Sequence, residues 1–468
     1  MPAIRLPFQS NPQEYREQGD DRLVNCFAEK IDGKAYRIRA WFGLVAVDED
    51  IDDISVRGSI EVDGALYVVF EGGGVRKFTK SGTTITRTDL DYISGSGPVF
   101  MARNQRDSVE IGILTGLGRY YIMQDDVLSV IPLDDLPPFI HMTELGGYFF
   151  FGTADGRVFN SGLNDAKVIG GLDYFTAEGH PDGLVALFKN RLELVVMGAK
   201  SMEVWGLDSN PPATGSPLVR LGGAVFPRGC LVATGIAEID NTFFWIGENR
   251  IVYRNVNYLP QRVSHYGVER SLLGEANIEN IRCSSFSLGG NEFFVLNGTE
   301  YTWVFNAATG WWHELKSYGR ERSAIEIYLA VWGGVYAFSK EDGNLYSVET
   351  DARLENGTVM PVVIRGMDLP AGLVCNDIEF DFVTGRAPIT GVSHETNPVV
   401  ELSWSDDGGA TWKNPRTLSL GAQGAYRNRV RATRLGKTGD ERGRRFELAI
   451  SDPHVVAFTR AVLNEARA

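Results

Sequence analysis

The clearest pattern of chemically useful residues is the stretch SDDGGATW at 405–412. It fits the Asp-box spacing S-x-D-x-G-x-T-W with every position filled, by Ser405, Asp407, Gly409, Thr411 and Trp412. An aspartate in such a loop accepts hydrogen bonds from backbone N–H groups, glycine permits positive φ angles, and tryptophan covers the hairpin with apolar surface. The spacing therefore predicts a clamped β-hairpin turn, with the remnant of a catalytic site as the alternative.

If the stretch is such a remnant, the protein would be a glycan-binding or glycan-degrading β-propeller, because Asp-boxes are familiar from sialidases and other sugar-cleaving propellers. A sialidase-like site also needs several arginines for the substrate carboxylate and a Tyr–Glu nucleophile pair, and the sequence assigns no such set. The Asp-box occurs once, whereas it usually recurs on several blades. No G-x-S-x-G elbow, Walker A loop, dinucleotide fingerprint or metalloprotease motif is present either. We therefore predict that the protein is not an enzyme.

Metal and cofactor chemistry finds little support in the sequence. The cysteines Cys26, Cys230, Cys283 and Cys375 are far apart and form no C-x-x-C, which favours small buried side chains over a metal or redox site. No two of the six histidines stand two or four residues apart, so a metal site would need distant residues. We predict no cofactor and no metal.

A basic segment, YRNRVRATRLGKTGDERGRR, interrupts the acidic composition at 426–445. Arg427, Arg429 and Arg431 alternate and are expected to share one face of a strand. Three unpaired arginines on one face repel each other unless acidic groups lie opposite. The interpretations are a solvated edge that discourages aggregation, an interface with an acidic neighbour, or contact with DNA. The three arginines are therefore candidates for a subunit interface.

The chain carries 46 Lys and Arg against 60 Asp and Glu, a formal net charge of −14. Phosphate binding needs a basic surface, so non-specific binding to nucleic acid is not expected. An acidic wall can still enclose a duplex without gripping it, because it repels the phosphates. The N-terminus lacks the apolar core of a signal peptide, and no apolar run reaches the roughly 20 residues of a membrane helix. We predict no membrane insertion by this chain.

The elements that must position these residues are β-hairpins. Apolar and aromatic strands flank turns rich in Gly, Asp or Asn at intervals of about 40–50 residues, which is the period of propeller blades. Examples are GGYFFFGTADGRVFNS at 146–161 and GGVYAFSKEDGNLYSVE at 333–349. The 53 glycines among 468 residues suit many short strands joined by tight turns. We predict an all-β protein with a β-propeller of six or seven blades at 51–355.

The two ends of the chain differ from this repeat. Residues 1–50 begin polar and irregular and end strand-like at AYRIRAWFGLVAV, so they form either an extended arm on a neighbour or the strand that closes the ring. Residues 356–468 contain several strands separated by long loops, such as RRFELAIS, in which apolar and polar residues alternate. We predict a C-terminal antiparallel β-sandwich there. A short helix is expected within 268–281.

Several stretches, in order along the chain, resemble the packaged-DNA stabilisation proteins of short-tailed double-stranded DNA phages, also called tail-hub or nozzle proteins. The likeness begins with RLPFQS and DDRLVNCFAEK and is strongest at 159–205, FNSGLNDAKVIGGLDYFTAEGHPDGLVALFKNRLELVVMGAKSMEVW. It continues through GGAVFPRGCLVATG and GNEFFVLNGTEYTWVFNAATGWWHEL to LSWSDDGGATWKNPRTLSLG and RVRATRLGKTGDERGRRFELAISDP. The resemblance therefore covers nearly the full length.

The resemblance implies a structural virion protein of the tail. Proteins of this family are similar in forming a six-fold ring below the portal and adaptor rings, where the ring continues the DNA channel and helps to retain packaged DNA. The implied partners are further copies of the chain in a hexamer, the adaptor, a tail needle or plug, and tailspike or fibre proteins. The duplex would be enclosed without sequence-specific binding. The implied location is the virion tail, assembled in the cytoplasm of the bacterial host.

Overall fold

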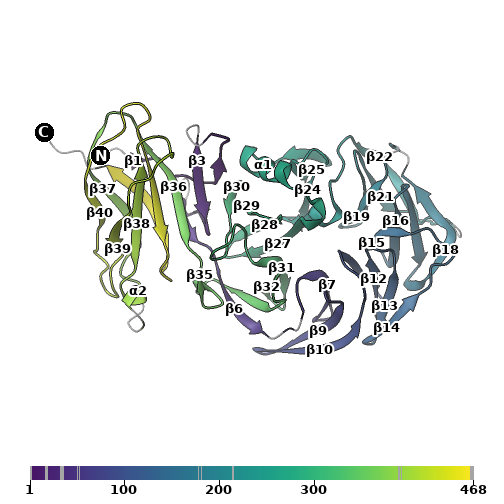
Figure 1. Ribbon diagram of the computed structural model, residues 1–468. Coiled ribbons are helices and arrows are strands. Elements are labelled where there is room, and N and C mark those ends of the chain that lie inside the picture. Colours follow the sequence, from purple (N-terminus) through teal and green to yellow (C-terminus); the bar gives the residue numbers. More distant parts are fainter. Residues whose placement is uncertain are drawn as a thin grey trace.

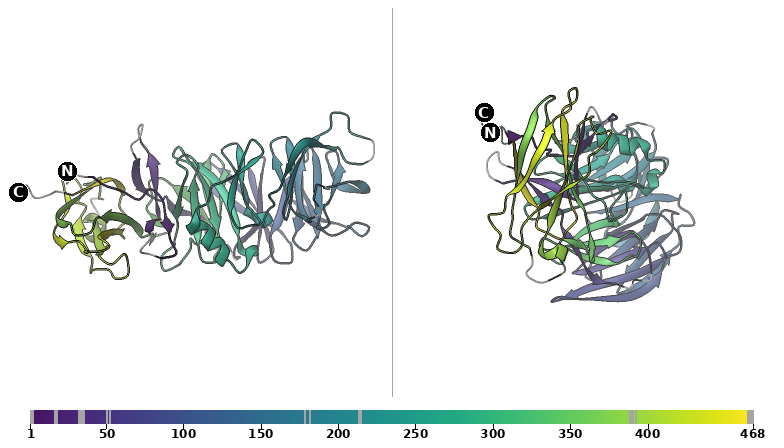
Figure 2. Two further views of the ribbon diagram at one scale, coloured as in Figure 1. Left: turned by 90° about the horizontal axis from the view of Figure 1, so that it is seen from above. Right: turned by 60° about the vertical axis from the view of Figure 1, so that its left-hand side comes forward.

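The computed structural model describes residues 3–15, 19–31, 36–49, 51, 53–177, 179–180, 182–212, 215–387, 391 and 393–463. Seven four-stranded antiparallel blades form a β-propeller, and a β-sandwich lies beside it (Figure 1). Seen from above, the molecule is elongated, with the sandwich at one end and blades three and four at the other (Figure 2). The predicted fold class, an all-β propeller with a C-terminal sandwich, is therefore confirmed, and the blade number is seven.

Strands that follow one another in the sequence pair within each blade. Blades one and two consist of β7 (Val56–Val62), β8 (Ala65–Phe70), β9 (Gly74–Ser81), β10 (Thr84–Tyr92), β11 (Val99–Arg103), β12 (Glu110–Thr115), β13 (Tyr120–Gln124) and β14 (Val127–Ile131). Blades three and four consist of β15 (Phe139–Leu145), β16 (Tyr148–Thr153), β17 (Arg157–Gly162), β18 (Asp165–Thr176), β19 (Leu184–Asn190), β20 (Glu193–Gly198), β21 (Met202–Leu207) and β22 (Leu218–Phe226).

The remaining blades continue this order, and the predicted helix follows the fifth of them. Blades five and six consist of β23 (Ile236–Ile239), β24 (Thr242–Ile246), β25 (Val252–Val256), β26 (Leu259–Arg262), β27 (Arg282–Leu288), β28 (Asn291–Asn297), β29 (Thr302–Asn306) and β30 (Trp311–Glu314). Blade seven consists of β31 (Ile325–Val331), β32 (Gly334–Ser339), β33 (Leu345–Glu349) and the N-terminal strand β6 (Gly43–Asp48). Helix α1 (Tyr266–Gly274) lies between blades five and six.

Tight turns and inter-blade packing produce this ring. At the turn from β7 to β8, Asp63 and Gly64 have φ angles of 51° and 79°, as the two-residue type I′ hairpin turn requires. The central strands of the blades are buried on both faces, and a hydrophobic cluster fills each of the seven gaps between blades. The cluster containing Phe70, Phe78 and Phe338 joins the last blade to the first.

Strand β6 closes the ring. It pairs antiparallel with β33 and takes the fourth position in blade seven. Trp41 and Phe42, just before it, are buried among aromatic side chains between blades six and seven. This part of residues 1–50 therefore completes the propeller of its own chain instead of reaching a neighbour.

Both ends of the chain build the sandwich. Its first sheet has the order β4–β5–β42–β37–β40, with β1 also paired to β42, and its second sheet runs β3–β36–β41–β38–β39. The N-terminal strands are β1 (Ala3–Ile4), β2 (Asn11–Pro12), β3 (Asp20–Val24), β4 (Cys26–Lys30) and β5 (Tyr36–Ala40). Its C-terminal elements are β36 (Val362–Leu369), β37 (Val374–Phe382), α2 (Ser393–Thr396), β38 (Val399–Ser405), β39 (Arg416–Ser419), β40 (Val430–Lys437), β41 (Arg444–Ile450) and β42 (Ala457–Leu463). The short strands β34 (Leu354–Glu355) and β35 (Thr358–Val359) instead extend the sheet of blade seven, where β34 pairs in parallel with β6.

A continuous sheet connects the two regions. Strand β3 pairs in parallel with β30 of blade six and antiparallel with β36 of the sandwich. Leu23 from β3 and Ile38 from β5 lie in one core with Phe446 and Phe458. Strands β1, β3, β4 and β5 thus contribute to the sandwich core. The division of the chain into domains at residues 50 and 355 stays a prediction.

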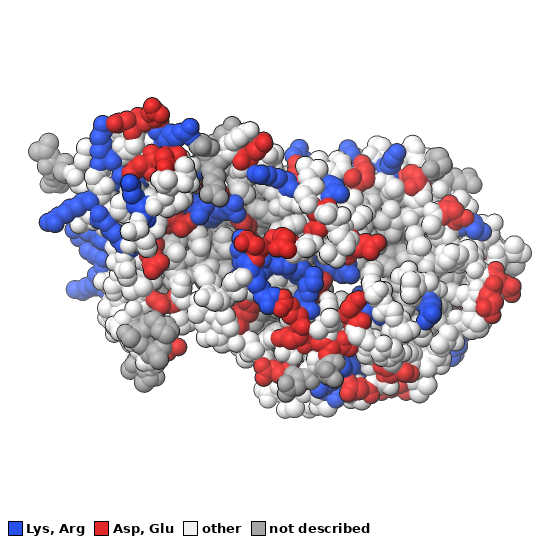
Figure 3. Space-filling model, in the orientation of Figure 1, with Lys and Arg blue, Asp and Glu red and all other residues white. Residues whose placement is uncertain are grey.

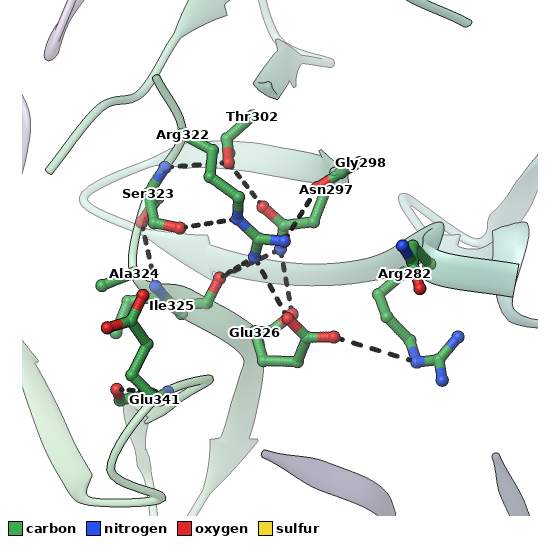
Figure 4. A network of polar contacts seen from close by, with 12 residues as sticks. Arg282, Asn297, Gly298, Thr302, Arg322, Ser323, Ala324, Ile325, Glu326 and Glu341 are labelled. Atoms are coloured by element: carbon green, nitrogen blue, oxygen red, sulfur yellow. Dashed lines mark hydrogen bonds and ion pairs between the residues drawn. The ribbon is translucent and has the colours of Figure 1, made fainter. Parts of the chain in front are cut away.

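A buried polar network supports the interface between blades six and seven (Figure 4). The Arg322 guanidinium donates to the carbonyls of Gly298 and Ser323 and to the Glu326 carboxylate, at 2.8, 2.9 and 3.1 Å. Arg282 approaches the other oxygen of Glu326 at 3.9 Å. The side chains of Arg322 and Glu326 are 10% and 5% exposed, so this is a buried ion pair whose donors are satisfied by backbone carbonyls.

Candidate functional site

The Asp-box forms the turn between β38 and β39. The Ser405 hydroxyl donates to Asp407 at 2.7 Å and accepts from the Gly409 N–H at 2.8 Å. The Asp407 carboxylate accepts from the N–H of Thr411 at 2.9 Å and from its hydroxyl at 2.5 Å. These hydrogen bonds, first of all that from the Thr411 hydroxyl, lower the pKa of Asp407. The carboxylate therefore clamps its own loop, in agreement with the predicted geometry.

Trp412 has a partner that the sequence did not indicate. The Arg365 guanidinium lies over the indole ring, 4.8 Å from its centroid, so the tryptophan stacks on a cation from strand β36. Asp406, next to the clamp residue, accepts two hydrogen bonds at 2.7 and 2.9 Å from Arg444, whose side chain is 2% exposed. The loop is thus attached to β36 and β41 by side chains outside the Asp-box pattern.

A chain of ion pairs continues from Arg365 into the propeller. Arg365 contacts both Glu447 and Asp20, and Arg22 contacts Asp20 at 2.9 Å and Glu314 at 2.7 Å. Burial alone would raise the pKa of Asp20, but hydrogen bonds and charge from Arg22 and Arg365 outweigh it and lower the pKa. Strand β3 therefore joins the two regions through charged side chains as well as through its backbone.

The predicted arginine face is only partly present. Strand β40 begins at Val430, so Arg431 lies in it, Arg429 precedes it and Arg427 lies in a turn. The expectation that all three share a strand face is wrong, because the turns around Gly421 and Gly424, both at φ 86°, delay the strand.

Acidic groups do lie opposite two of these arginines, but they belong to the same chain. On the neighbouring strand β37, Glu379 accepts from Arg429 Nε at 2.9 Å, and Asp377 accepts from Arg431 Nε at 2.5 Å. Arg427 has no ion-pair partner within the described part of the chain. Repulsion between the arginines is thus relieved within the subunit, and all three remain exposed.

The propeller axis contains a cavity of about 510 Å³ lined by the innermost strand of every blade. Phe100, His141, Phe188, Cys283 and Tyr328 are among its lining residues. Its volume is that of a small-molecule pocket, which spans about 300–1,000 Å³. The cavity on the propeller axis therefore has room for a small molecule and not for a DNA duplex.

Titratable side chains within the described part of the chain were compared with the grouping that a metal site needs. Over the residues the structure describes, no three His, Cys, Asp or Glu side chains are grouped so that they could hold a metal ion. The four cysteines are free thiols. His141 and His313 are buried, and burial lowers the pKa of each from 6.5 to about 3, so both are neutral side chains of the interior.

A second cavity, here called the joint pocket, lies between the β2–β3 segment, helix α1 and blade six, with a volume of about 450 Å³. It contains Arg22 and Tyr301, residue types that a sialidase-like site would need. However, Arg22 is already bound to Asp20 and Glu314, and the Tyr301 hydroxyl has no hydrogen-bond partner among the residues described. The joint pocket therefore lacks the free arginine cluster and the Tyr–Glu pair of such a site.

The seven closed blades and the sandwich built onto them define a class of propeller–sandwich proteins. Within it, this chain belongs to the bacteriophage P22 Gp10 family: the β-propeller model matches residues 24–351 and the β-sandwich model matches residues 368–464. The resemblance seen in the sequence is thus confirmed, and the protein is a structural component of a phage tail and of the virion.

Other comparisons add little about function. Among solved structures, the WD40 repeats of RRP9 are similar over 66% of this chain and 99% of theirs, at 10% identity and a TM-score of 0.44. BamB from Moraxella catarrhalis is similar over 66% of this chain and 97% of its own, at 12% identity and a TM-score of 0.39. No curated protein sequence matches. Among the described residues, no helix is long and apolar enough to cross a membrane.

Proposed function

We propose that six copies of this chain form a ring whose central channel encloses the packaged double-stranded DNA. The closed propeller axis is the observation that carries this proposal. Since the cavity on that axis is only about 510 Å³, a channel wide enough for DNA has to lie between copies. A chain that carries a net charge of −14 encloses the duplex without gripping it.

The seam between copies is proposed to include Arg427, Arg429 and Arg431. Residues 356–468 hold 14 Lys and Arg against 13 Asp and Glu, whereas residues 1–355 hold 32 against 47. Lys and Arg gather on the outer flank of the sandwich, and Asp and Glu along the lower edge of the propeller (Figure 3). The sandwich of one copy can therefore face the propeller of the next with complementary charge, in the head-to-tail contact that closes a ring.

The ring is proposed to lie below the portal and the adaptor, and to dock a needle or plug and the tailspike or fibre proteins. In that place it continues the channel, retains the genome after packaging and lets it pass at ejection. Assembly would take place in the cytoplasm of the bacterial host. The family assignment supports this position, and the proposed work is binding alone, with no catalytic step and no cofactor.

Virions assembled without the protein test this function. They are expected to package DNA and then to lose it, measured as DNA content per particle over time. A triple variant with Arg427, Arg429 and Arg431 changed to Glu is expected to fold as a monomer. When it replaces the wild-type protein, it is expected not to restore DNA retention to the virions. Particles that lack the protein yet keep both genome and tail would contradict the proposal.

A further inference from the structure

Three neighbouring hairpin turns of blades four and five line a cavity of about 350 Å³, here called the turn pocket. The turns join β19 to β20, β23 to β24 and β25 to β26. Two hydrogen bonds connect them: Arg191 donates to the Asn241 carbonyl at 2.9 Å, and the Tyr258 hydroxyl donates to Glu193. The volume lies in the range of small-molecule pockets. The turn pocket therefore combines a fixed wall with room for a ligand.

Planar polar side chains make up most of the lining of the turn pocket. The side-chain amides of Asn255 and Asn257 make no hydrogen bond to any residue the structure describes. Arg191 forms no ion pair with a described residue, whereas Arg254 is neutralised by Asp240 at 2.6 Å. An amide group both donates and accepts hydrogen bonds, as a hydroxyl group does. The lining therefore suits a ligand with several hydroxyl groups better than a simple ion.

Tyr258 adds a fixed aromatic ring to this lining. Its hydroxyl is held by Glu193, and its ring lies parallel to that of Phe226, with 6.3 Å between the centroids and 1° between the planes. The residue is nevertheless 40% exposed. The negative face of an aromatic ring attracts the C–H groups of a sugar ring, and a side chain that is already fixed loses little entropy on contact. Planar polar groups beside a fixed aromatic ring are the arrangement that a saccharide requires.

Turn chemistry explains only part of the lining. Hairpin turns with positive φ favour Asn, which accounts for Asn257. They also favour glycine, as at Gly64 of blade one, yet the turn pocket has Tyr258 at φ 63° and Arg191 at φ 58°. Asn255 lies within β25 and outside any turn. Residues held in strained backbone conformations cluster at binding sites, so these side chains indicate a ligand.

We propose that the turn pocket binds a saccharide unit. The amides and the Arg191 guanidinium pair with its ring hydroxyls, and Tyr258 packs against its C–H face. Contact with a glycan would be a further activity of this virion protein, beyond its structural role. The pocket is complete within one chain, so the inference does not rest on the proposed ring.

Saturation-transfer NMR on the full-length chain tests the proposal. The probes are methyl glycosides of hexoses, deoxyhexoses, N-acetylhexosamines and uronic acids, with sorbitol as an open-chain polyol for comparison. At least one glycoside is expected to bind saturably, with the strongest transfer to the protons of one ring face, whereas sorbitol is expected not to bind. No saturable binding by any glycoside, or equal binding by sorbitol, overturns the proposal. Either result leaves the proposed hexamer untouched, because the isolated chain needs no ring here.

Two variants identify the site. Arg191→Gly removes the guanidinium and relieves the positive φ, so the melting temperature should stay or rise while affinity falls about tenfold, the loss of one hydrogen bond to a charged group. Tyr258→Gly removes the aromatic face and should abolish saturable binding. Arg434→Gly is the matched control and should retain affinity, because Arg434 is exposed on the sandwich at φ 57°. Wild-type affinity in either pocket variant overturns the proposal.

Discussion

Six of the seven blades consist only of strands adjacent in sequence, whereas the sandwich also pairs strands more than 300 residues apart, such as β3 and β36. The propeller repeats a local hairpin, and only strand β6 closes it from a distance. The sandwich depends on both chain ends and on charged side chains along β3. Local contacts form early and at low entropic cost, and non-local ones late. We therefore expect the propeller to persist when the sandwich is disturbed.

Removal of residues 1–41 should produce the largest difference in amide protection between the propeller and the sandwich. The deletion takes Leu23, Ile38 and the whole of β3 from the sandwich core but leaves β6 in blade seven. We expect fast amide exchange throughout 362–463 while blades one to five stay protected, measured by hydrogen exchange and mass spectrometry. Deletion of residues 1–15, which removes only β1 and β2, is the milder control. Equal protection of both regions in the longer deletion would refute the dependence on the N-terminal strands.

Glu326→Ala breaks the buried network inside the propeller. It leaves Arg322 charged and enclosed, and loss of one partner of a buried pair costs about 3–5 kcal/mol. Urea unfolding gives the free energy. The exposed pair of Lys437 and Asp440 supplies the control, because Asp440→Ala should change stability by less than about 1 kcal/mol. If Glu326→Ala lowers the free energy of unfolding by no more than Asp440→Ala does, the network does not stabilise the blades.

Asp406→Ala is the matching change in the sandwich. Its partner Arg444 is buried, but Asp406 itself is 26% exposed, so water can enter and a smaller cost of about 3 kcal/mol is expected. Arg444→Met, which removes the charge and keeps the volume, should restore much of the stability in the double variant. The coupling is measured by a double-mutant cycle. Additive single effects would contradict a direct role for this pair.

Acid should weaken the native state through His313 and His141. Burial lowers the native pKa of each to about 3, while the unfolded state takes up a proton below about 6.5. The unfolded state then binds more protons, so stability is complete above pH 6.5 and falls as the pH drops toward 3. For one histidine the loss is about 2 kcal/mol at pH 5.

His313→Gln tests that pH effect, measured as unfolding free energy at pH 7 and pH 5. The variant should lose less stability on acidification than wild type, by about 2 kcal/mol. The exposed His180 provides the control, and His180→Gln should leave the difference unchanged. An unaltered pH dependence in His313→Gln would mean that this histidine is not held neutral by burial.

Asp407→Ala should have the smallest effect. The Thr411 N–H loses its acceptor, so amide exchange at Thr411 should speed up locally while the blades remain unchanged. Ser405→Ala provides a second break of the same clamp, because it removes the acceptor of the Gly409 N–H. Unchanged exchange in both variants would show that the Asp-box does not hold its turn.

Sequence patterns predicted the propeller better than the connection between propeller and sandwich, and the reason is physical. The conformation of a hairpin turn such as Asp63–Gly64 depends on neighbouring residues, so a short stretch of sequence is enough to predict it. The place of β3 between β30 and β36 depends on pairing across some 300 residues, which no local period encodes. Because of the glycine turns, β40 begins at Val430, after Arg427, although the alternating arginines suggested a strand that included Arg427.

The Asp-box and the joint pocket also differ in how far the sequence predicts them. Asp407 and its clamp follow from the spacing of one octapeptide, and the structure has that geometry. The pair of Asp406 and Arg444 was missed, although the first aspartate of SDDGG and the adjacent arginines of RRF could have indicated it. The joint pocket combines residues from β3, α1 and blade six, so no motif could indicate it.

The most direct measurement is an electron cryo-microscopy map of the assembled tail. We expect the map to show a six-fold ring of these chains around a DNA-wide channel, with each propeller axis closed and the sandwich of one copy against the propeller of the next. DNA density passing through the axis of a single propeller, or a tail without a ring of this protein, would contradict it.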